Sequence, residues 1–408
     1  MSIVEKVKNI FSKKDSEQNK HYITAKESRR ISRENFKITR KYEKAKKRKI
    51  NPSEYATEMK DNDNILELDD LHTYFFTDIG TVKSVDGVSF NIPKGKVVGV
   101  VGESGCGKSV TSLSIMQLVQ APQGQIVSGS IRFNSQYGAV DIAKMPTNAM
   151  RQIRGKEIAM IFQEPMTSLN PVFTIGNQLD EVSLLHLGLS KEEAKARSIE
   201  MLKTVGIAMA KEVYTYFPHQ LSGGMRQRVM IAMALLCNPR LIIADEPTTA
   251  LDVTIQAQIL DLLKEIKEKI NGSIMLITHD LGVIAEMADY VVVMYAGKVV
   301  ERGTAREVFK NPLHPYTIGL QKAKPSKLKK VDRLYSIPGQ VPNPVNMPKY
   351  CYFHDRCDMK KDFCTGELPV LHQVSDTHFV ACHLYDEIKK ELDNDPMFNK
   401  QEEVSSNE

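Results

Sequence analysis

A glycine-rich segment carries the strongest chemical signal in this sequence. Residues 102–109 read Gly-Glu-Ser-Gly-Cys-Gly-Lys-Ser and fit the pattern G-x-x-x-x-G-K-[ST] after an apolar run. Glycines let the backbone wrap around phosphate groups, and the N-terminus of a following helix adds positive potential. In this pattern the lysine reaches the β- and γ-phosphates, and the last hydroxyl holds Mg²⁺. We therefore expect ATP and Mg²⁺ as ligands and a helix through Val119, with contacts from Gly102, Ser104, Gly105, Cys106, Gly107, Lys108, Ser109 and Val110.

Two adjacent carboxylates end another apolar run. Residues 241–247 read Leu-Ile-Ile-Ala-Asp-Glu-Pro, which is typical of a buried strand followed by a turn. Because neighbouring side chains of a strand point to opposite sides, Asp245 and Glu246 can perform different tasks. We expect Asp245 to hold Mg²⁺ and Glu246 to act as the general base that orients the attacking water. Solvated loop carboxylates are the alternative, but the glycine-rich loop in the same chain disfavours it.

Strands and helices must alternate to bring these groups together. Short β-type runs lie at 96–101, 241–244, 273–277 and 290–294. Between them, apolar residues recur on one helical face, at Ile255, Ile259, Leu262, Ile266 and Ile270. Asn271-Gly272 is typical of the end of that helix. This alternation predicts an α/β fold with a parallel sheet.

Several further segments resemble the ATPases of ABC transporters, in the order found in that family. The resemblance covers about residues 65–310. Leu221-Ser222-Gly223-Gly224-Met225 resembles the signature L-S-G-G-Q, with Met in place of Gln. Gln163 resembles the glutamine of the Q-loop, Ala250-Leu251-Asp252 resembles the D-loop, and His279 resembles the switch histidine. Phe75 resembles the aromatic residue that stacks on adenine, although Tyr74 or Phe76 could also take that place.

The resemblance implies a fold, a mechanism and site residues. The fold would be an ABC-type P-loop ATPase domain with a helical subdomain at about residues 165–235. The signature residues would bind the γ-phosphate of ATP held by an opposite subunit, so that two ATP molecules lie between two subunits. Gln163 would contribute to Mg²⁺ binding and catalysis, and His279 would contact the γ-phosphate. The segment from Gln163 to Asn177 would transmit dimer closure to membrane partners.

Two later segments narrow the resemblance to one branch of the family. Residues 311–317 (Asn-Pro-Leu-His-Pro-Tyr-Thr) and 336–342 (Ser-Ile-Pro-Gly-Gln-Val-Pro) resemble the D-type ATPases of oligopeptide and dipeptide permeases. This implies an importer of peptides with a second, homologous ATPase, two transmembrane permease subunits and an extracytoplasmic peptide-binding protein. The chain itself would lie at the cytoplasmic face of the membrane as a peripheral subunit.

The distribution of charge separates the N-terminal part from the rest. Residues 1–60 contain 18 Lys and Arg against 8 Asp and Glu, whereas the remainder contains 37 against 42. No run reaches the roughly 18–20 apolar residues of a membrane-spanning helix, and the N-terminus lacks the apolar core of a signal peptide. We expect a soluble chain with a basic extension at 1–63, the ATPase domain at 64–310, a Cys-containing region at 311–390 and a polar tail at 391–408. The extension would be partly helical or disordered and solvated, or it would place Ile3, Val4, Val7, Ile10 and Phe11 on an anionic membrane.

Four cysteines gather near the C-terminus in the spacing C-x5-C-x6-C-x17-C. In a cytosolic chain such a cluster favours a metal site over disulfides, although close C-x-x-C pairs are absent. Members of the resembling family bind a [4Fe–4S] cluster with such cysteines, which implies that role for Cys351, Cys357, Cys364 and Cys382. Zinc and no metal remain alternatives. His354 and His383 are potential substitute ligands, but exposed loop histidines are the preferred interpretation.

Other functions remain to be weighed against peptide import. A similar ATPase could serve an importer of nickel or another small solute. A soluble ABC ATPase could act on DNA or ribosomes, and an inactive one could serve as a scaffold. However, only 113 positions separate Lys108 from Leu221, without the sustained heptads of a long coiled coil, and the chain carries one cassette. The main body is mildly acidic, so we expect no nucleic-acid partner.

Overall fold

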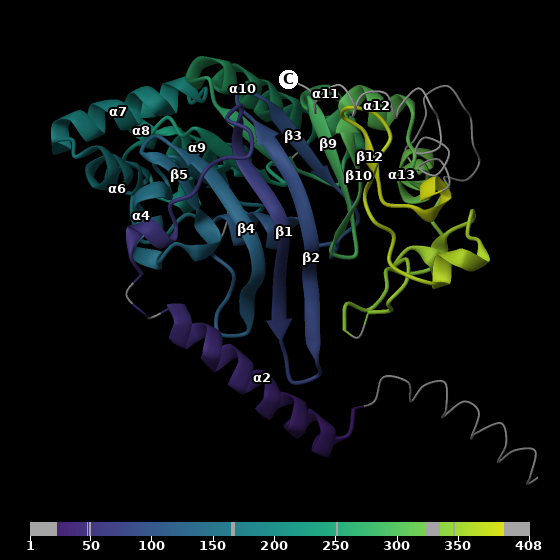
Figure 1. Cartoon of the computed structure of the whole chain (residues 1–408). Coiled ribbons are helices and arrows are strands. Elements are labelled where there is room, and N and C mark those ends of the chain that lie inside the picture. The colour runs from purple at the N-terminus through teal and green to yellow at the C-terminus, as the bar shows by residue number, and fades with distance from the viewer. Residues whose placement is uncertain are drawn as a thin grey trace, which may run out of the picture.

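The computed structural model describes residues 23–46, 48, 50–164, 168–249, 252–323, 335–345 and 347–386. Two sheets form its centre (Figure 1). The smaller sheet has the order β2 (Thr81–Pro93), β1 (Asn64–Phe76), β4 (Gly124–Ser135) and β5 (Gly138–Asp141). The larger sheet has the order β11 (His372–Gln373), β12 (Phe379–Val380), β10 (Lys298–Thr304), β9 (Tyr290–Tyr295), β3 (Val97–Val101), β8 (Ser273–Ile277), β7 (Leu241–Asp245) and β6 (Ile158–Ile161).

Helices follow most strands of the larger sheet and fill the space between β6 and β7. Those before β7 are α2 (Ala25–Lys46), α3 (Lys108–Ile115), α4 (Thr147–Ile153), α6 (Ile175–Leu187), α7 (Lys191–Thr204), α8 (Ala210–Val213) and α9 (Gly223–Leu235). Those after β7 are α10 (Val253–Ile270), α11 (Leu281–Met287), α12 (Ala305–Lys310) and α13 (Pro315–Lys322). Short 3₁₀ turns lie at Pro52–Glu54, Ile142–Lys144, Pro218–Gln220, His354–Arg356, Asp362–Thr365 and His383–Tyr385. Among the described residues, no helix is both long and apolar enough to cross a membrane.

The centre of the larger sheet is parallel and buried. Strands β9, β3, β8, β7 and β6 pair in parallel, and every residue of β3, β7 and β8 is buried. Their continuous Val, Ile and Leu runs fit strands that are covered on both faces. The carboxyl ends of β3, β8, β7 and β6 therefore lie side by side. In open parallel sheets this edge is where ligands bind.

The helices α6–α9 form a layer beside the larger sheet, at the left of Figure 1. The start of α7 is fixed by a capping box, in which Ser190 accepts from the Glu193 backbone and Glu193 accepts from the Ser190 backbone. Helix α9 is attached within this layer, because the Arg197 guanidinium from α7 donates to the Leu236 carbonyl just after α9. The signature at the start of α9 is thereby held on a packed helix.

The C-terminal region extends the larger sheet. Strand β12 pairs antiparallel with β10, and β11 pairs with β12. The fully buried carboxylate of Glu301 in β10 organises the connection, since it accepts from the backbone N–H groups of Leu313 and His314. The His378 ring nitrogen lies 2.8 Å from the same carboxylate. Residues after α12 are thus attached to the ATPase core by buried polar contacts.

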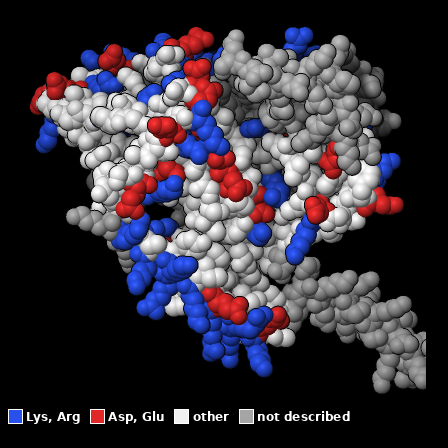
Figure 2. All heavy atoms as spheres, in the orientation of Figure 1, with Lys and Arg blue, Asp and Glu red and all other residues white. Residues whose placement is uncertain are grey.

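Part of the basic extension folds onto the smaller sheet. Helix α2 lies across the ends of β1 and β2 (Figure 1). The Asn35 amide donates to the Thr77 carbonyl at 2.6 Å, and the Tyr42 ring stacks on Phe76 with centroids 6.3 Å apart. Lys and Arg cover the outer side of this helix (Figure 2), which carries nine basic against three acidic residues. The expectation of a partly helical, solvated extension fits this segment, whose side chains other than Asn35 and Thr39 are exposed or partly exposed, and the predicted amphipathic helix at 3–11 lies outside the described residues.

The sequence predicted the four central strands to within one residue at each end. The helix after the glycine-rich loop was predicted too long, because α3 ends at Ile115 rather than Val119. Gln117 adopts a left-handed φ of 49°, and the Leu118 N–H donates back to the Leu113 carbonyl. This Schellman-type ending stops the helix without a glycine. The end of α10 follows the prediction, with Asn271 rather than Gly272 in the left-handed conformation.

Candidate functional site

The site begins where four parallel strands end. The glycine-rich loop follows β3, Gln163 follows β6, Asp245 ends β7 with Glu246 directly after it, and His279 follows β8. Because these strands are neighbours in the sheet, residues up to 177 positions apart (His279 and Gly102) share one edge. The structure brings together the residues that the sequence had assigned to phosphate binding and water activation.

Two glycines of the loop occupy positions that no side chain could share. Gly102 has φ 153°, and a Cβ there would lie 2.2 Å from the Met294 carbonyl oxygen. Gly107 has φ 100°, and a Cβ there would lie 2.2 Å from the Ser84 carbonyl oxygen. Gly105 differs, because its φ of 78° favours glycine while the space beside it is open. The loop is therefore pressed against β2 and β9, with its exposed rim at Ser104 and Gly105.

Lys108 and Ser109 start α3 and face the strand ends. The Lys108 ammonium is buried and donates to the carbonyls of Gly102 at 2.8 Å and Glu103 at 3.1 Å. Lys108 therefore braces the loop from inside, where its charge can also meet a phosphate.

Asp245 is held by two serine hydroxyls of α3. Ser109 donates to one carboxylate oxygen at 3.1 Å and Ser112 donates to the other at 3.2 Å. Burial raises the pKa of Asp245, and this outweighs the lowering by the two hydroxyls. A buried carboxylate beside a hydroxyl is an oxygen-rich pair suited to a hard cation such as Mg²⁺.

Glu246 is the centre of a second polar group. Its carboxylate accepts from the Gln163 amide at 3.0 Å and from the Thr249 hydroxyl at 2.9 Å. The Nδ1 atom of His279 lies 3.4 Å from the other carboxylate oxygen. Glu246 also has a φ of 47°, an uncommon conformation for a non-glycine residue. Strained backbone of this kind often occurs at functional sites, where the surrounding structure fixes the residue. The Glu246 side chain is 15% exposed.

The signature lies at the start of α9, away from this cluster. Ser222 caps the helix by accepting from the Met225 N–H at 3.3 Å. A Cβ at Gly223 would meet nothing within 4 Å, whereas one at Gly224 would touch Ile255 of α10. Among the described residues, no hydrogen bond or ion pair joins residues 221–225 to the glycine-rich loop. The open helix N-terminus is therefore available to an anion from outside this chain.

Comparison with known proteins matches this geometry to a family. Residues 85–249 match the family described as ABC transporter, and residues 300–364 match the one described as oligopeptide/dipeptide transporter, C-terminal region. The oligopeptide transport ATP-binding protein AppD of Bacillus subtilis is 52% identical over 323 residues, covering 79% of this chain and 97% of that protein. The chain belongs to the ABC transporter family.

Other relatives agree with this assignment. The dipeptide transport ATP-binding protein DppD of Escherichia coli is 46% identical, and the alignment covers 78% of this chain and 96% of that protein. Among solved structures, a dimeric ATP-binding cassette bound to ADP and Pi aligns with a TM-score of 0.53 at 27% identity, covering 59% of this chain and 99% of that one. A Clostridium perfringens cassette that is part of an ABC transporter complex aligns at 0.51 and 28% identity, covering 61% and 92%. The predicted α/β fold of an ABC ATPase is confirmed.

The sequence left open which of three adjacent aromatic residues, Tyr74, Phe75 or Phe76, would stack on adenine. In this ABC ATPase the Tyr74 hydroxyl donates to Asp86 at 2.5 Å, and Phe76 is buried against α2. Phe75 is only half-buried and lies opposite Val82 in β2, the strand that backs the glycine-rich loop. The Phe75 ring packs beside Gly124 of β4, where a Cβ would lie 2.8 Å from its Cε1 atom. Its contact with adenine stays a prediction.

Three polar residues of the site were not predicted. Ser112 holds Asp245, and Thr249 holds Glu246. The Gln227 amide from α9 donates to the Pro247 carbonyl at 2.6 Å and so joins α9 to the turn after β7. Ser112 lies three residues after Ser109, and Thr249 lies three residues after Glu246. This spacing is a sequence signal from which both could have been predicted. Asp252 of the D-loop caps α10 by accepting from the Ile255 N–H, while residues 250 and 251 lie outside the described residues.

The four C-terminal cysteines line one small pocket, together with His354 and His383. Burial raises the pKa of Cys351 to about 11 and that of Cys382 to about 12. Among the described residues, no group of three or more His, Cys, Asp or Glu is arranged to hold a metal ion. The predicted metal site is therefore not confirmed.

The two histidines near these cysteines are not exposed, which corrects the sequence-based interpretation. The His354 side chain is 18% exposed and lies 3.0 Å from Asp355. The His383 side chain is 12% exposed and lies 2.6 Å from Asp386. Both rings are held by carboxylates on the rim of the pocket, so packing in this region involves more than the thiols.

Proposed function

We propose that this ABC ATPase hydrolyses ATP to power the import of oligopeptides or dipeptides through membrane-spanning partners. The main support for the proposal is that one chain contains both an ATPase site and a C-terminal region of the peptide transporter type. Neighbouring strand ends gather Lys108, Asp245 and Glu246, and residues 300–364 are of the oligopeptide/dipeptide transporter type. Relatives matched over nearly their whole length are named as transport ATP-binding proteins for oligopeptides and dipeptides. The peptide itself would contact other subunits.

Each residue of the site has a proposed role. ATP would lie along the glycine-rich loop, with its base against Phe75 and its β- and γ-phosphates near Lys108. Mg²⁺, when bound, supplies charge neutralisation at these phosphates. Ser109, Asp245 and Gln163 are the residues that would hold it. Glu246 would accept the proton of the attacking water. The remaining predicted contacts are from Gly102, Ser104, Gly105, Cys106, Gly107, Val110, His279 and Asp252.

We propose that the active unit is a pair of ATPases. The open N-terminus of α9 supports this, because a Cβ at Gly223 would meet no atom of the described residues within 4 Å. Leu221, Ser222, Gly223, Gly224 and Met225 would bind the γ-phosphate of ATP held by the partner. The partner would be a homologous second ATPase, so that binding of two ATP molecules closes the pair and hydrolysis reopens it.

The proposed location is the cytoplasmic face of the membrane, as a peripheral subunit. Two permease subunits would span the bilayer, and an extracytoplasmic binding protein would deliver the peptide. Support comes from the segment between Gln163 and α6, where Val172 is 71% and Phe173 is 50% exposed. Exposed apolar side chains on a segment that also contacts Glu246 suit a permease contact.

The experiment is a gentle detergent pull-down of the tagged full-length chain from its native membrane, followed by mass spectrometry. We expect two multi-spanning permeases, a second ATPase and a peptide-binding protein. If the permeases are recovered with a binding protein for nickel or another solute, the proposed peptide substrate is wrong, but the proposed transport function stands. Ribosomal or DNA-repair proteins without permeases would overturn transport and leave the ATPase chemistry.

For the cysteine pocket we propose a [4Fe–4S] cluster that braces the C-terminal region, with Zn²⁺ as the alternative. The support is that four soft sulfur donors, Cys351, Cys357, Cys364 and Cys382, line the same small pocket, although among the described residues they are not arranged as a metal-holding group. When bound, the cluster would supply cross-links between loop segments. Full-length protein purified without oxygen should be brown and contain about four irons per chain, as four thiolate ligands imply. Colourless protein with zinc, or without metal, would contradict this.

A further inference from the structure

A carboxylate inside the phosphate-binding loop is paired with an arginine from the C-terminal region. Glu103 is the residue after Gly102, at a position that the loop pattern leaves free. The Arg356 guanidinium makes two contacts with it, at 2.6 Å and 3.0 Å, to the two carboxylate oxygens. The Arg356 side chain is 6% exposed and that of Glu103 is 27% exposed. This is a two-pronged, largely desolvated pair, the geometry in which arginine differs most from lysine.

Glu103 is also held at its backbone. Its N–H donates to the hydroxyl of Tyr316 at 2.8 Å, and its carbonyl accepts from Lys108 at 3.1 Å. Tyr316 is fully buried in α13, within the segment that resembles peptide permease ATPases. Two residues from beyond the ATPase cassette therefore fix one residue of the loop. A loop fixed in this way loses less conformational freedom when it wraps a ligand.

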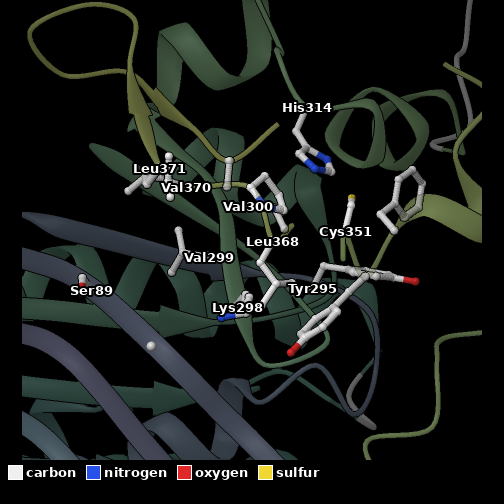
Figure 3. A pocket seen from close by; sticks show the side chains of 15 residues that line it. Ser89, Tyr295, Lys298, Val299, Val300, His314, Cys351, Leu368, Val370 and Leu371 are labelled. Atoms are coloured by element: carbon white, nitrogen blue, oxygen red, sulfur yellow. The ribbon is translucent and has the colours of Figure 1, made fainter. Parts of the chain in front are cut away.

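Arg356 is itself locked in place. Its Nε donates to the Pro338 carbonyl at 2.8 Å, and its guanidinium lies near the rings of Tyr295 and Phe353. The rings of Tyr295, Tyr316 and Phe353 pack together with centroids 4.7–5.4 Å apart. Figure 3 shows Tyr295 with His314 and Cys351 on the wall of the apolar cavity beside this cluster. The packed aromatic cluster and the Pro338 carbonyl thus fix the direction in which the Arg356 guanidinium points toward the loop.

The charge on Glu103 explains why this clamp would be needed. A negative charge in a loop that wraps phosphates repels them, and the repulsion is strong where water is excluded. Arg356 cancels that charge and fixes its direction. Removing Arg356 alone would leave the carboxylate uncompensated beside the phosphates, whereas removing both charges would not.

We propose that Arg356 is a positioning residue for ATP binding, which neutralises Glu103 and holds the phosphate loop in its binding conformation. The C-terminal region would then complete the nucleotide site in addition to any role in partner binding. The proposal rests on the proposed ATPase function, because it concerns the affinity of that same site.

The test is a double-mutant cycle in the full-length chain with Arg356→Gln, Glu103→Gln and both together. ATP affinity is measured by calorimetry, and KM and kcat by phosphate release. We expect Arg356→Gln to weaken ATP binding about tenfold or more, because an uncompensated carboxylate in the loop repels the phosphates. The effect should appear in KM more than in kcat. Glu103→Gln should stay within about threefold of wild type, and the double variant should recover most of the lost affinity.

Arg302→Gln is the matched control. Arg302 also attaches the C-terminal region, with its guanidinium 4.3 Å from the Phe379 ring centroid, but it does not touch Glu103. It should lower thermal stability without changing ATP affinity. Equal affinity of Arg356→Gln and wild type would overturn the proposal, and so would a double variant as weak as Arg356→Gln. If Arg356→Gln does not fold, Arg356→Lys tests the two-pronged contact alone, because it keeps the charge: it should weaken ATP binding less than about tenfold but measurably, and the double variant should still bind ATP nearly as wild type does. Wild-type protein that does not bind ATP would instead refute the proposed function.

Discussion

The Gln163 amide donates a hydrogen bond to the carboxylate of Glu246 at 3.0 Å, although the two residues follow different strands. Gln163 leads into the segment before α6, where apolar side chains are exposed, and Glu246 is the proposed base. A movement of that segment would therefore change the hydrogen bonding of the base directly. This contact would connect the proposed permease-binding segment to the proposed base.

Replacement of Glu246 by Gln should separate binding from hydrolysis. The amide keeps the size of the side chain but cannot accept a proton from water. We expect ATP affinity to stay near wild type and the rate of phosphate release to fall at least about 100-fold, the scale of general-base catalysis. Thr249→Val removes one hydrogen bond to Glu246 but keeps the carboxylate, so it should reduce the rate much less. Unchanged turnover in the Glu246 variant would show that another group activates the water.

Replacement of Lys108 by Ala should weaken ATP binding by about tenfold or more, since a charge-assisted contact to phosphate is lost. The same change also frees the carbonyls of Gly102 and Glu103, so a fall in melting temperature is expected as well. Lys94→Ala is the control, because Lys94 donates to the Asn62 carbonyl on an exposed surface. Calorimetric titration with ATP distinguishes the two variants. Equal affinities would contradict the role assigned to Lys108.

Much of the site could be predicted because its signals are local. The glycine-rich loop, the carboxylate pair after β7 and the histidine after β8 each combine an apolar strand with a few polar residues. Parallel pairing then brings them to one edge, as expected for an α/β sheet. The strand ends at Val101, Asp245 and Ile277 were foreseeable for that reason.

The rest depends on contacts between distant residues. Arg356 and Glu103 are 253 positions apart, and neither has a spacing that signals the other. Helix α2 reads as solvated because of its charge, yet Asn35 and Tyr42 attach it to the hairpin of β1 and β2. Gln117 ends α3 in a left-handed conformation that is usually reserved for glycine or asparagine. Tertiary packing decides each case.

Replacement of Gly223 by Asp should block the pairing of ATPases without harming the fold. The space beside Gly223 is open, so the side chain is accommodated in the single chain. Its negative charge would lie where the partner's γ-phosphate is proposed to bind. We expect a normal melting temperature and normal ATP binding in the isolated chain, with hydrolysis by the assembled transporter reduced at least about tenfold. Gly188→Asp in a surface turn is the control for added charge. It has equally open space, but its φ of 65° also makes it sensitive to backbone strain.

The last prediction concerns acid stability of the C-terminal region and depends on Glu307. Its carboxylate accepts from the hydroxyls of Thr304, Ser375 and Thr377 at 2.7–2.9 Å, which ties α12 to the turn between β11 and β12. Burial alone would raise the pKa of Glu307, but these hydrogen bonds outweigh it and lower the pKa to about 2. The unfolded chain protonates this group near pH 4.5. Stability from the carboxylate is therefore complete above pH 4.5 and is lost as the pH falls towards 2.

Glu307→Gln keeps the shape and one acceptor but removes the charge. It should lower stability at pH 7 and flatten the dependence of stability on pH between 4.5 and 2, measured by denaturant unfolding at several pH values. Glu286→Gln is the matched control, since Glu286 is 59% exposed and pairs with Lys264. That variant should keep the wild-type slope, because an exposed ion pair contributes little. If both variants retain the wild-type slope, Glu307 does not link α12 to the C-terminal turn through its charge, and the neutral hydrogen bonds alone hold the two segments together.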